Sequence, residues 1–208
     1  MKKAILLIAL GFFSLKGNAQ EQLRNSISVP LIRLEANSQT LNGDLNLKFM
    51  TGIEYQRFIN KWSFGVKYEH GYNKIEENPT NCYDCFYGTG FMREDNVYLS
   101  ANYSILDFFN SKLKLNTGLA VYYSNLNFSG DYQGGFSGTG KRENSTFNTF
   151  GLAPSISIIY YPTERLFISV NSNIRYGWSQ EFDANSNQDR KTKEYVLTTP
   201  ELKVGVRF

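Results

Sequence analysis

The feature that most constrains this chain is an alternation of apolar and polar side chains that recurs in segment after segment. In the last eight residues, ELKVGVRF, charged residues and one glycine share one parity. The other parity holds Leu202, Val204, Val206 and Phe208. A period of two places successive side chains on opposite faces of a β-strand. The pattern therefore predicts an all-β protein whose strands have one apolar face and one polar face.

Eight segments share this alternation. We expect them to form strands over residues 26–35, 46–58, 62–74, 94–105, 112–126, 147–161, 166–178 and 194–208. The first segment is less regular than the others, because its apolar parity slips by one residue after Pro30.

The connections between these strands alternate in length. The short ones are residues 59–61, 106–111 and 162–165, and the long ones are residues 36–45, 75–93, 127–146 and 179–193. An antiparallel meander places all short turns at one end and all long loops at the other. This layout is typical of outer-membrane barrels, which have short periplasmic turns and longer external loops. We therefore predict an eight-stranded antiparallel up-and-down transmembrane β-barrel, with both termini on the periplasmic side.

The polar parity is predicted to face the barrel interior, because it also carries the glycines of the strands. These are Gly52, Gly65, Gly71, Gly118, Gly151, Gly177 and Gly205. The interior of an eight-stranded barrel is only just wide enough for its own side chains, so glycines there leave room for larger ones. We expect a network of charged side chains in the lumen, formed by Glu54, Lys67, Glu69, Lys114, Arg175, Glu201, Lys203 and Arg207. The apolar parity would then face lipid, with aromatic residues near the interfaces.

Residues 1–19 are predicted to be a cleaved signal peptide. Lys2 and Lys3 precede a short apolar stretch, and small residues end the segment before Gln20. The remaining residues, 20–208, form one predicted barrel domain. Removal of the three lysines of the signal peptide leaves 19 basic and 19 acidic residues. This balance argues against a nucleic-acid partner, which would favour a clustered basic excess.

The end of the chain resembles the terminal signature of bacterial outer-membrane proteins, with Phe208 last and Val206 and Val204 at alternate positions. The whole of 20–208 resembles the eight-stranded OmpA/OmpX-like barrel class. This resemblance implies location in the cell outer membrane, with membrane lipid and the barrel-assembly machinery as partners. The rival fold is a secreted lipocalin-type barrel with an apolar interior. Charged residues that share a parity with the glycines disfavour this rival.

Two local motifs suggest chemistry but have simpler interpretations. Cys82-Tyr83-Asp84-Cys85 predicts a disulfide between Cys82 and Cys85, favoured in an oxidising compartment, and a redox or metal role stays open. Residues 135–142 are similar to a phosphate-binding loop, but Arg142 stands where a hydroxyl is needed and no βαβ unit surrounds the segment. We interpret it as part of an external loop. No metal or cofactor is expected.

His70 is the only histidine of the chain, so any mechanism based on serine, histidine and an acid would depend on it. Its parity places it with Tyr68 and Tyr72 in the outer aromatic belt. An interfacial histidine is the simpler interpretation, and we predict that the protein is not an enzyme.

The leading functional hypothesis is a structural or surface-interaction protein. Loops 75–93 and 127–146 contain aromatic residues that could contact a partner or fold over the barrel mouth. Two alternatives remain open at this point. One is a narrow pore for ions or small solutes, and the other is an outer-leaflet lipid-modifying enzyme centred on His70.

Overall fold

The computed structural model describes residues 24–37, 45–48, 50–77, 87–109, 112–133, 140–183 and 189–208. Its strands are β1 (Asn25–Asn37), β2 (Leu45–Lys48), β3 (Met50–Ile59), β4 (Trp62–Glu77), β5 (Tyr87–Phe108), β6 (Leu113–Gln133), β7 (Gly140–Tyr160), β8 (Leu166–Asp183) and β9 (Asp189–Arg207). The predicted signal peptide and the predicted disulfide between Cys82 and Cys85 lie outside the described residues. No helix that is long and apolar enough to span a bilayer is present in the described ranges.

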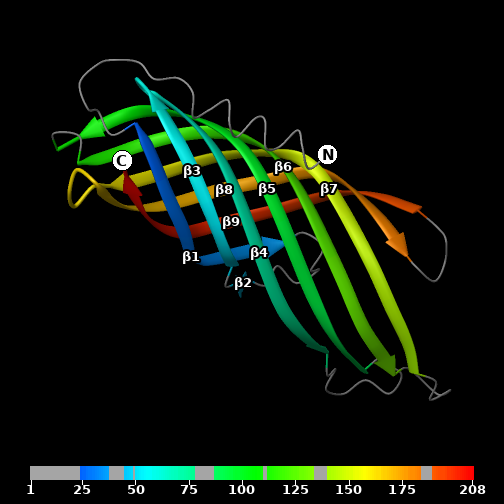
Figure 1. Cartoon of the computed structure of the whole chain (residues 1–208). Coiled ribbons are helices and arrows are strands. Elements are labelled where there is room, and N and C mark those ends of the chain that lie inside the picture. The colour runs from blue at the N-terminus through cyan, green and yellow to red at the C-terminus, as the bar shows by residue number, and fades with distance from the viewer. Residues whose placement is uncertain are drawn as a thin grey trace.

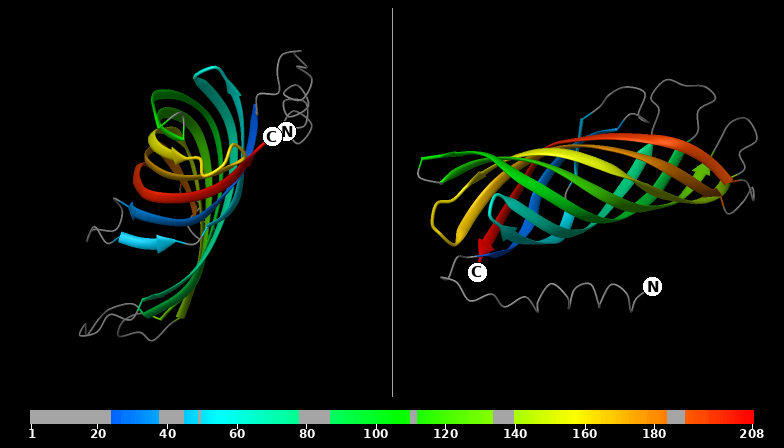
Figure 2. Two further views of the ribbon diagram at one scale, coloured as in Figure 1. Left: turned by 90° about the vertical axis from the view of Figure 1, so that its left-hand side faces the viewer. Right: turned by 90° about the horizontal axis from the view of Figure 1, so that it is seen from above.

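The strands form one closed antiparallel sheet (Figure 1). From β3 to β9 each strand pairs with its neighbours in chain order, and β1 pairs with both β3 and β9. The short β2 also pairs with β1, so β2 and β3 together replace the single predicted strand 46–58. The wall therefore has eight strands, which confirms the predicted barrel. Figure 2 shows the sheet curving around until β9, in red, returns to β1, in blue.

Closure of the barrel includes the last residue of the chain. The backbone N–H of Phe208 donates to the carbonyl of Asn25 at 2.9 Å, and the N–H of Asn25 donates to the carbonyl of Phe208 at 3.0 Å. Figure 1 shows the end of β9 beside the start of β1. This pairing leaves no open edge at the seam, as a barrel in lipid requires, because unpaired backbone groups are costly without water.

The two faces of the wall have opposite character. Large apolar side chains point outward and are half exposed, such as Leu99 at 56%, Ile158 at 50% and Ile174 at 51%. Charged side chains such as Glu69 and Glu201 are fully buried on the inner face. This polarity is the reverse of a soluble lipocalin-type barrel, and it is the arrangement that the glycine parity predicts.

Several strands are longer than the sequence pattern predicted. β5 has 22 residues, and β6 and β7 have 21 each. The prediction that 75–93, 127–146 and 179–193 are loops is therefore wrong for most of their residues. Beyond a membrane both faces of a sheet can be wet, so the alternation disappears while the backbone ladder continues. Figure 1 shows the outer ends of β4 to β7 extending past the rest of the barrel.

The irregularity after Pro30 is present in β1. The pairing of β1 with β9 shifts register between Pro30 and Ile32, as in a β-bulge. Leu31 and Ile32 both face outward, and Arg33 points inward and is buried. Proline cannot donate a hydrogen bond to a neighbouring strand, which is why it occurs at such positions. The bulge thus brings an arginine into the lumen.

Candidate functional site: the charged interior and the outer collar

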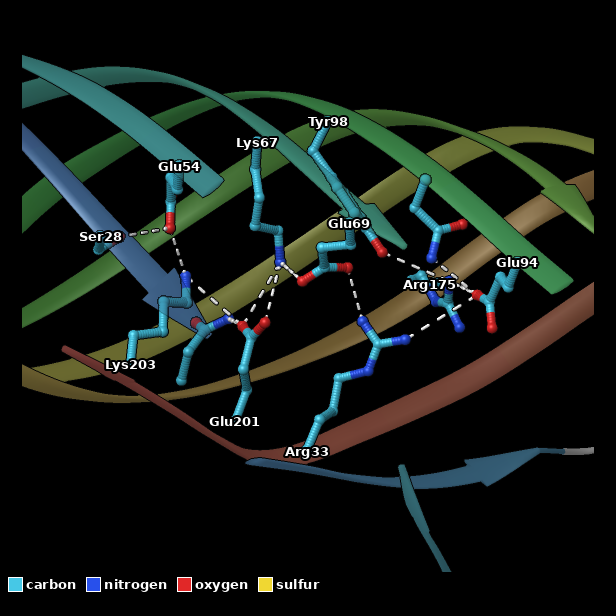
Figure 3. A network of polar contacts seen from close by, with 12 residues as sticks. Ser28, Arg33, Glu54, Lys67, Glu69, Glu94, Tyr98, Arg175, Glu201 and Lys203 are labelled. Atoms are coloured by element: carbon cyan, nitrogen blue, oxygen red, sulfur yellow. Dashed lines mark hydrogen bonds and ion pairs between the residues drawn. The ribbon is translucent and has the colours of Figure 1, made fainter. Parts of the chain in front are cut away.

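The barrel interior contains a cluster of buried charges that we call the lumen network (Figure 3). It has four cations and four carboxylates, so its net charge is zero: Arg33, Lys67, Arg175, Lys203, Glu54, Glu69, Glu94 and Glu201. They come from β1, β3, β4, β5, β8 and β9, and their side chains converge inside the barrel. Buried charges are tolerated when they are paired and hydrogen-bonded, and this cluster meets that condition through the contacts below.

On the side of the short turns, the network begins at Glu54. The Nζ of Lys203 lies 2.7 Å from Oε2 of Glu54 and 3.5 Å from Oε2 of Glu201. The side-chain amide of Gln56 donates to Oε1 of Glu54 at 2.7 Å. Both oxygens of Glu54 therefore accept a hydrogen bond, and Lys203 links β3 to β9 across the lumen.

Lys67 is the centre of the network. Its Nζ lies 2.7 Å from Oε1 of Glu69 and 3.1 Å from Oε1 of Glu201. It also lies over the ring of Tyr98, 4.3 Å from the ring centroid. Glu201 accepts a further hydrogen bond from Asn171 at 3.1 Å. A charge held by two carboxylates and an aromatic face is well compensated away from water.

Two arginines extend the network toward the outer end. Nη1 of Arg33 lies 2.6 Å from Oε2 of Glu69, and Nη1 of Arg175 lies 3.0 Å from Oε1 of Glu94. Nη2 of Arg33 is 3.9 Å from that same Glu94 oxygen, so the two pairs are joined. Arg175 also donates to the hydroxyl of Tyr98 at 3.3 Å. A continuous series of ionic contacts thus runs from Glu54 to Arg175, as the dashed lines of Figure 3 show.

Aromatic and small residues fill the interior beside β6 and β7. The rings of Tyr98 and Tyr122 are stacked with centroids 5.9 Å apart, against Ala120 and Ala153. Gly177 makes room for this pair, since a Cβ there would lie 2.5 Å from the hydroxyl oxygen of Tyr122. The interior is therefore charged on one side and aromatic on the other.

The turn end is closed by a different group, which we call the floor. Arg207 lies 5.2 Å from the ring centroids of both Phe58 and Tyr161. Tyr161 in turn contacts Phe167, with ring centroids 5.9 Å apart. Cation–π contacts of this kind hold a guanidinium where it has partly left water.

The structure separates two of the eight predicted lumen residues from the network. Arg207 belongs to the floor, and Lys114 lies near a short turn with its Nζ 3.7 Å from Asp107. Sequence reasoning also missed Arg33 and Glu94. Arg33 has the inward parity only because the apolar parity slips by one residue after Pro30. This slip is visible in the sequence and could have identified Arg33 as a lumen residue. Glu94 has the same parity as Ser100 and Asn102 in its predicted strand, so parity could have identified it as well.

A small cavity lies between the network and the floor. Its volume is about 60 Å³, and serine and asparagine side chains form much of its lining, with Glu54, Lys67 and Lys203 and with Ile159 and Phe167. One water needs roughly 10–15 Å³ of such volume, so about four to six waters would fit. Within the described ranges no group of three metal-ligating side chains gathers. The cavity can hydrate the network but is too small for a larger solute.

The outer face carries a second arrangement, a row of six polar side chains that we call the collar. Cross-strand pairing aligns them with one from each strand from β3 to β8: Thr51, His70, Asp95, Asn125, Asn148 and Gln180. On the same six strands, the next outward row toward the turns is apolar or aromatic throughout: Ile53, Tyr68, Val97, Tyr123, Phe150 and Trp178. The apolar band of the barrel therefore ends between these two rows.

Tyrosine hydroxyls mark this boundary. Tyr68 donates to Oδ1 of Asp95 at 2.7 Å, and Tyr123 donates to Oδ1 of Asn148 at 2.7 Å. Tyrosine suits an interface because its ring is apolar while its hydroxyl needs a polar partner. Both rings thus lie in the apolar band and both hydroxyls reach the collar.

His70 has a carboxylate partner, Asp95, which was not predicted from the sequence. Nδ1 of His70 lies 2.8 Å from Oδ1 of Asp95, and Nε of Arg93 donates to Oδ2 at 3.0 Å. Partial burial acts to raise the pKa of Asp95, but hydrogen bonds from His70 and Tyr68 and the charge of Arg93 outweigh it and lower that pKa. The adjacent hydroxyl of Thr51 donates to the backbone carbonyl of His70 at 3.2 Å. This histidine–acid pair is therefore held in place by its surroundings.

No family model matches this chain, and no curated protein matches it. Among solved structures, the outer membrane protein OprG from Pseudomonas aeruginosa aligns with a TM-score of 0.55 at 14% identity, over 89% of this chain and 96% of OprG. Neisserial surface protein A aligns with a TM-score of 0.51 at 14% identity, over 88% of this chain and 97% of that protein.

A major outer membrane protein from Thermus thermophilus aligns with a TM-score of 0.50 at 13% identity, over 88% of this chain and 99% of that protein. This chain has the fold of the outer-membrane β-barrels. At such low identity the likeness extends to the fold alone, and fold does not determine function. The shared fold agrees with the resemblance to the OmpA/OmpX-like class and with the outward apolar band.

Proposed function

We propose that this protein is an outer-membrane barrel that does not conduct solutes and that acts at the cell surface through the part of the sheet beyond the membrane. The observation that carries this proposal is the lumen network. Its eight charges compensate one another, and the lysine–glutamate contacts at its centre are as short as 2.7 Å. An ion entering such a lumen would have to break buried ion pairs, which is strongly unfavourable.

Two further features support a closed barrel. On the turn side of the network, the described part of the lumen holds a cavity of about 60 Å³. On the turn side of this cavity, the floor places Arg207 beside the rings of Phe58 and Tyr161. A hydrated solute would have to pass both the network and the floor.

The long outer strands support a role at the surface. A tilted strand crosses a membrane with about 9–11 residues, whereas β5, β6 and β7 have 21 or 22. Residues 87–94 of β5 lie past the collar, and they pair with residues 126–133 of β6. This extension of β4 to β7 is the part of the sheet that we propose a partner would contact. Because β-strands give a stiff support, a partner would meet a preorganised surface.

Conductance is the first test. Purified protein that shows heat-shifted mobility on gels should be added to planar bilayers. We expect no stable conductance steps from the wild type, whereas regular steps would overturn the closed-barrel proposal. A variant that removes the centre of the network, Lys67→Ala with Glu201→Ala, serves as a positive control if it still assembles, because it should admit ions.

Surface binding is the second test. Outer-membrane vesicles with the wild type should be compared with vesicles in which 78–86 and 134–139 are replaced by Gly-Ser segments of equal length. Adhesion to panels of immobilised glycans and matrix proteins is measured. We expect adhesion that the replacement abolishes while heat-shifted mobility remains. A matched replacement of the short turn 162–165 should keep adhesion, and equal adhesion of all three forms would contradict the proposal.

A further inference from the structure

The collar has a composition that the barrel itself does not need. A barrel wall needs an apolar band and aromatic residues at the interface, and the row with Tyr68, Tyr123 and Trp178 provides them. The collar adds an imidazole, a carboxylate and three side-chain amides in register on neighbouring strands. These groups face outward one row beyond the apolar band, where lipid headgroups would begin.

Hydrogen bonds along the collar fix its side chains relative to one another. Asn125 donates to Oδ1 of Asn148 at 2.7 Å, and Asn127, one row farther out, donates to Oδ1 of Asn125. Thr146 donates to Oδ1 of Asn127 at 2.9 Å. Four polar side chains on β6 and β7 thus form one connected surface. A surface that is already ordered loses little entropy when it binds a ligand.

A cation lies beside this surface. Arg93 is on β5, one row beyond Asp95, and 61% of its side chain is exposed. Its Nε is held by Asp95, which sets the direction of the guanidinium. Arginine is well suited to phosphate because its planar fork can donate two parallel hydrogen bonds. Asp95 accepts bonds from Tyr68, His70 and Arg93, so it acts here as an anchor for the cation.

The collar occurs at one end of the barrel. At the opposite end, most of the outward side chains next to the short turns are apolar or aromatic, including Ile59, Trp62, Phe108, Tyr160 and Leu166. If the short turns are periplasmic, as in barrels of this fold, the collar lies in the outer leaflet. A one-sided polar surface fits a membrane whose leaflets have different headgroups.

We propose that the collar, together with Arg93, Asn127 and Thr146, binds the headgroup of a phosphorylated glycolipid in the outer leaflet. Arg93 takes a phosphate, the amides of β6 and β7 take sugar hydroxyls, and the aromatic row contacts the first carbons of the acyl chains. This inference rests on the membrane location in the proposed function but not on a surface partner or on a closed lumen.

The test uses full-length protein in nanodiscs made of phosphatidylethanolamine and phosphatidylglycerol. Lipopolysaccharide is added in phosphorylated or dephosphorylated form, and native mass spectrometry counts the bound glycolipid. The variants are Arg93→Ala and the pair Asn125→Ala with Asn148→Ala. Arg165→Ala, an exposed arginine at a short turn, is the matched control. Heat-shifted mobility verifies that every variant is folded.

We expect the wild type and Arg165→Ala to bind the phosphorylated glycolipid. Arg93→Ala should lower that binding at least tenfold and leave the weaker binding of the dephosphorylated form unchanged. The asparagine pair should weaken binding of both forms. Equal binding by all variants, or binding of phosphatidylglycerol as strong as that of the glycolipid, would overturn the proposal. A folded and non-conducting barrel without bound glycolipid would also overturn it and would leave the proposed function intact.

Discussion

Lys67 and Glu201 meet across the lumen, with Nζ and Oε1 3.1 Å apart, although 134 positions separate them in the chain. Glu201 also contacts Lys203 and Asn171 and has no exposed surface. The contact links β4 to β9, two strands that are not neighbours in the wall. It therefore braces the barrel across its interior, which the ladder of backbone hydrogen bonds around the wall cannot do.

Replacement of Glu201 should destabilise the barrel strongly. Glu201→Gln leaves Lys67 and Lys203 with an excess of buried positive charge, and removal of one partner of a buried ion pair typically costs about 3–5 kcal/mol. The free energy of unfolding can be measured from the loss of heat-shifted mobility in urea. Glu164→Gln, at an exposed position of a short turn, is the control and should change stability little. Similar midpoints for the two variants would contradict the bracing role.

The inward glycines should differ in their tolerance of alanine. A Cβ on Gly151 would meet the backbone of β8 at Gly177 Cα, 2.5 Å away, and the ring of Tyr122 at 2.8 Å. A Cβ on Gly71 would meet chiefly the flexible end of Met50. We expect Gly151→Ala to lower stability by about 1–3 kcal/mol, the usual range for overpacking. Gly71→Ala should be nearly neutral in the same urea assay. Equal stability of the two variants would contradict this prediction and would show that Tyr122 and β8 can move to accommodate the added methyl group.

The last residue should have two separable roles. Deletion of Phe208 removes the two backbone hydrogen bonds with Asn25, and it should impair both refolding in detergent and assembly in cells. Phe208→Ala keeps those backbone groups and loses only the ring. If the aromatic terminus is a signal for the assembly machinery, Phe208→Ala should refold normally in detergent but assemble poorly in cells. Normal assembly of this variant in cells would contradict the signal.

His70→Ala distinguishes an interfacial histidine from a catalytic one. The substitution removes one hydrogen bond to Asp95, while Tyr68 and Arg93 still hold that carboxylate. We expect normal barrel assembly and an unchanged lipid profile, measured by mass spectrometry of the outer membrane with and without the protein. A lipid modification that depends on the wild type and disappears in His70→Ala would establish the enzyme alternative instead.

The carboxylate of Asp95 should make a pH-dependent contribution to stability. Its pKa is lowered in the folded protein, so the contribution is present above the ordinary value of about 3.9 and is lost as pH falls through the folded value. The stability difference between wild type and Asp95→Asn should therefore be constant near neutral pH and shrink below about pH 4. A difference that stays constant down to pH 2 would show that charge is not its source.

Much of the fold could be predicted because a membrane barrel imposes a strict period of two. Within the apolar band, each residue such as Leu99 or Glu69 must face either lipid or lumen, so parity determines its side. Outside the band both faces meet water, and residues 87–93 and 127–133 carry no alternation although they are strand. Strand length beyond the membrane is therefore not encoded in hydrophobicity.

The membership of the lumen network was less predictable for a different reason. Parity predicts that Arg175 and Arg207 both point inward, but it does not predict the position of each along the barrel axis. That depth follows from strand tilt and register, which place Arg175 beside Glu94 and place Arg207 beside Tyr161 at the floor. Collar residues such as Asn125 and Asn148 could be recognised only after the register of several strands was known.

The extended sheet of β4 to β7 rises over only part of the barrel circumference (Figure 1). Seen from the medium, such a molecule has a tall side and a low side. The orientation of the barrel about the membrane normal therefore determines which neighbouring molecules contact the extended sheet. A neighbour that approaches from the tall side would meet β4 to β7, and one that approaches from the low side would not. A barrel of uniform height would present the same surface in every direction.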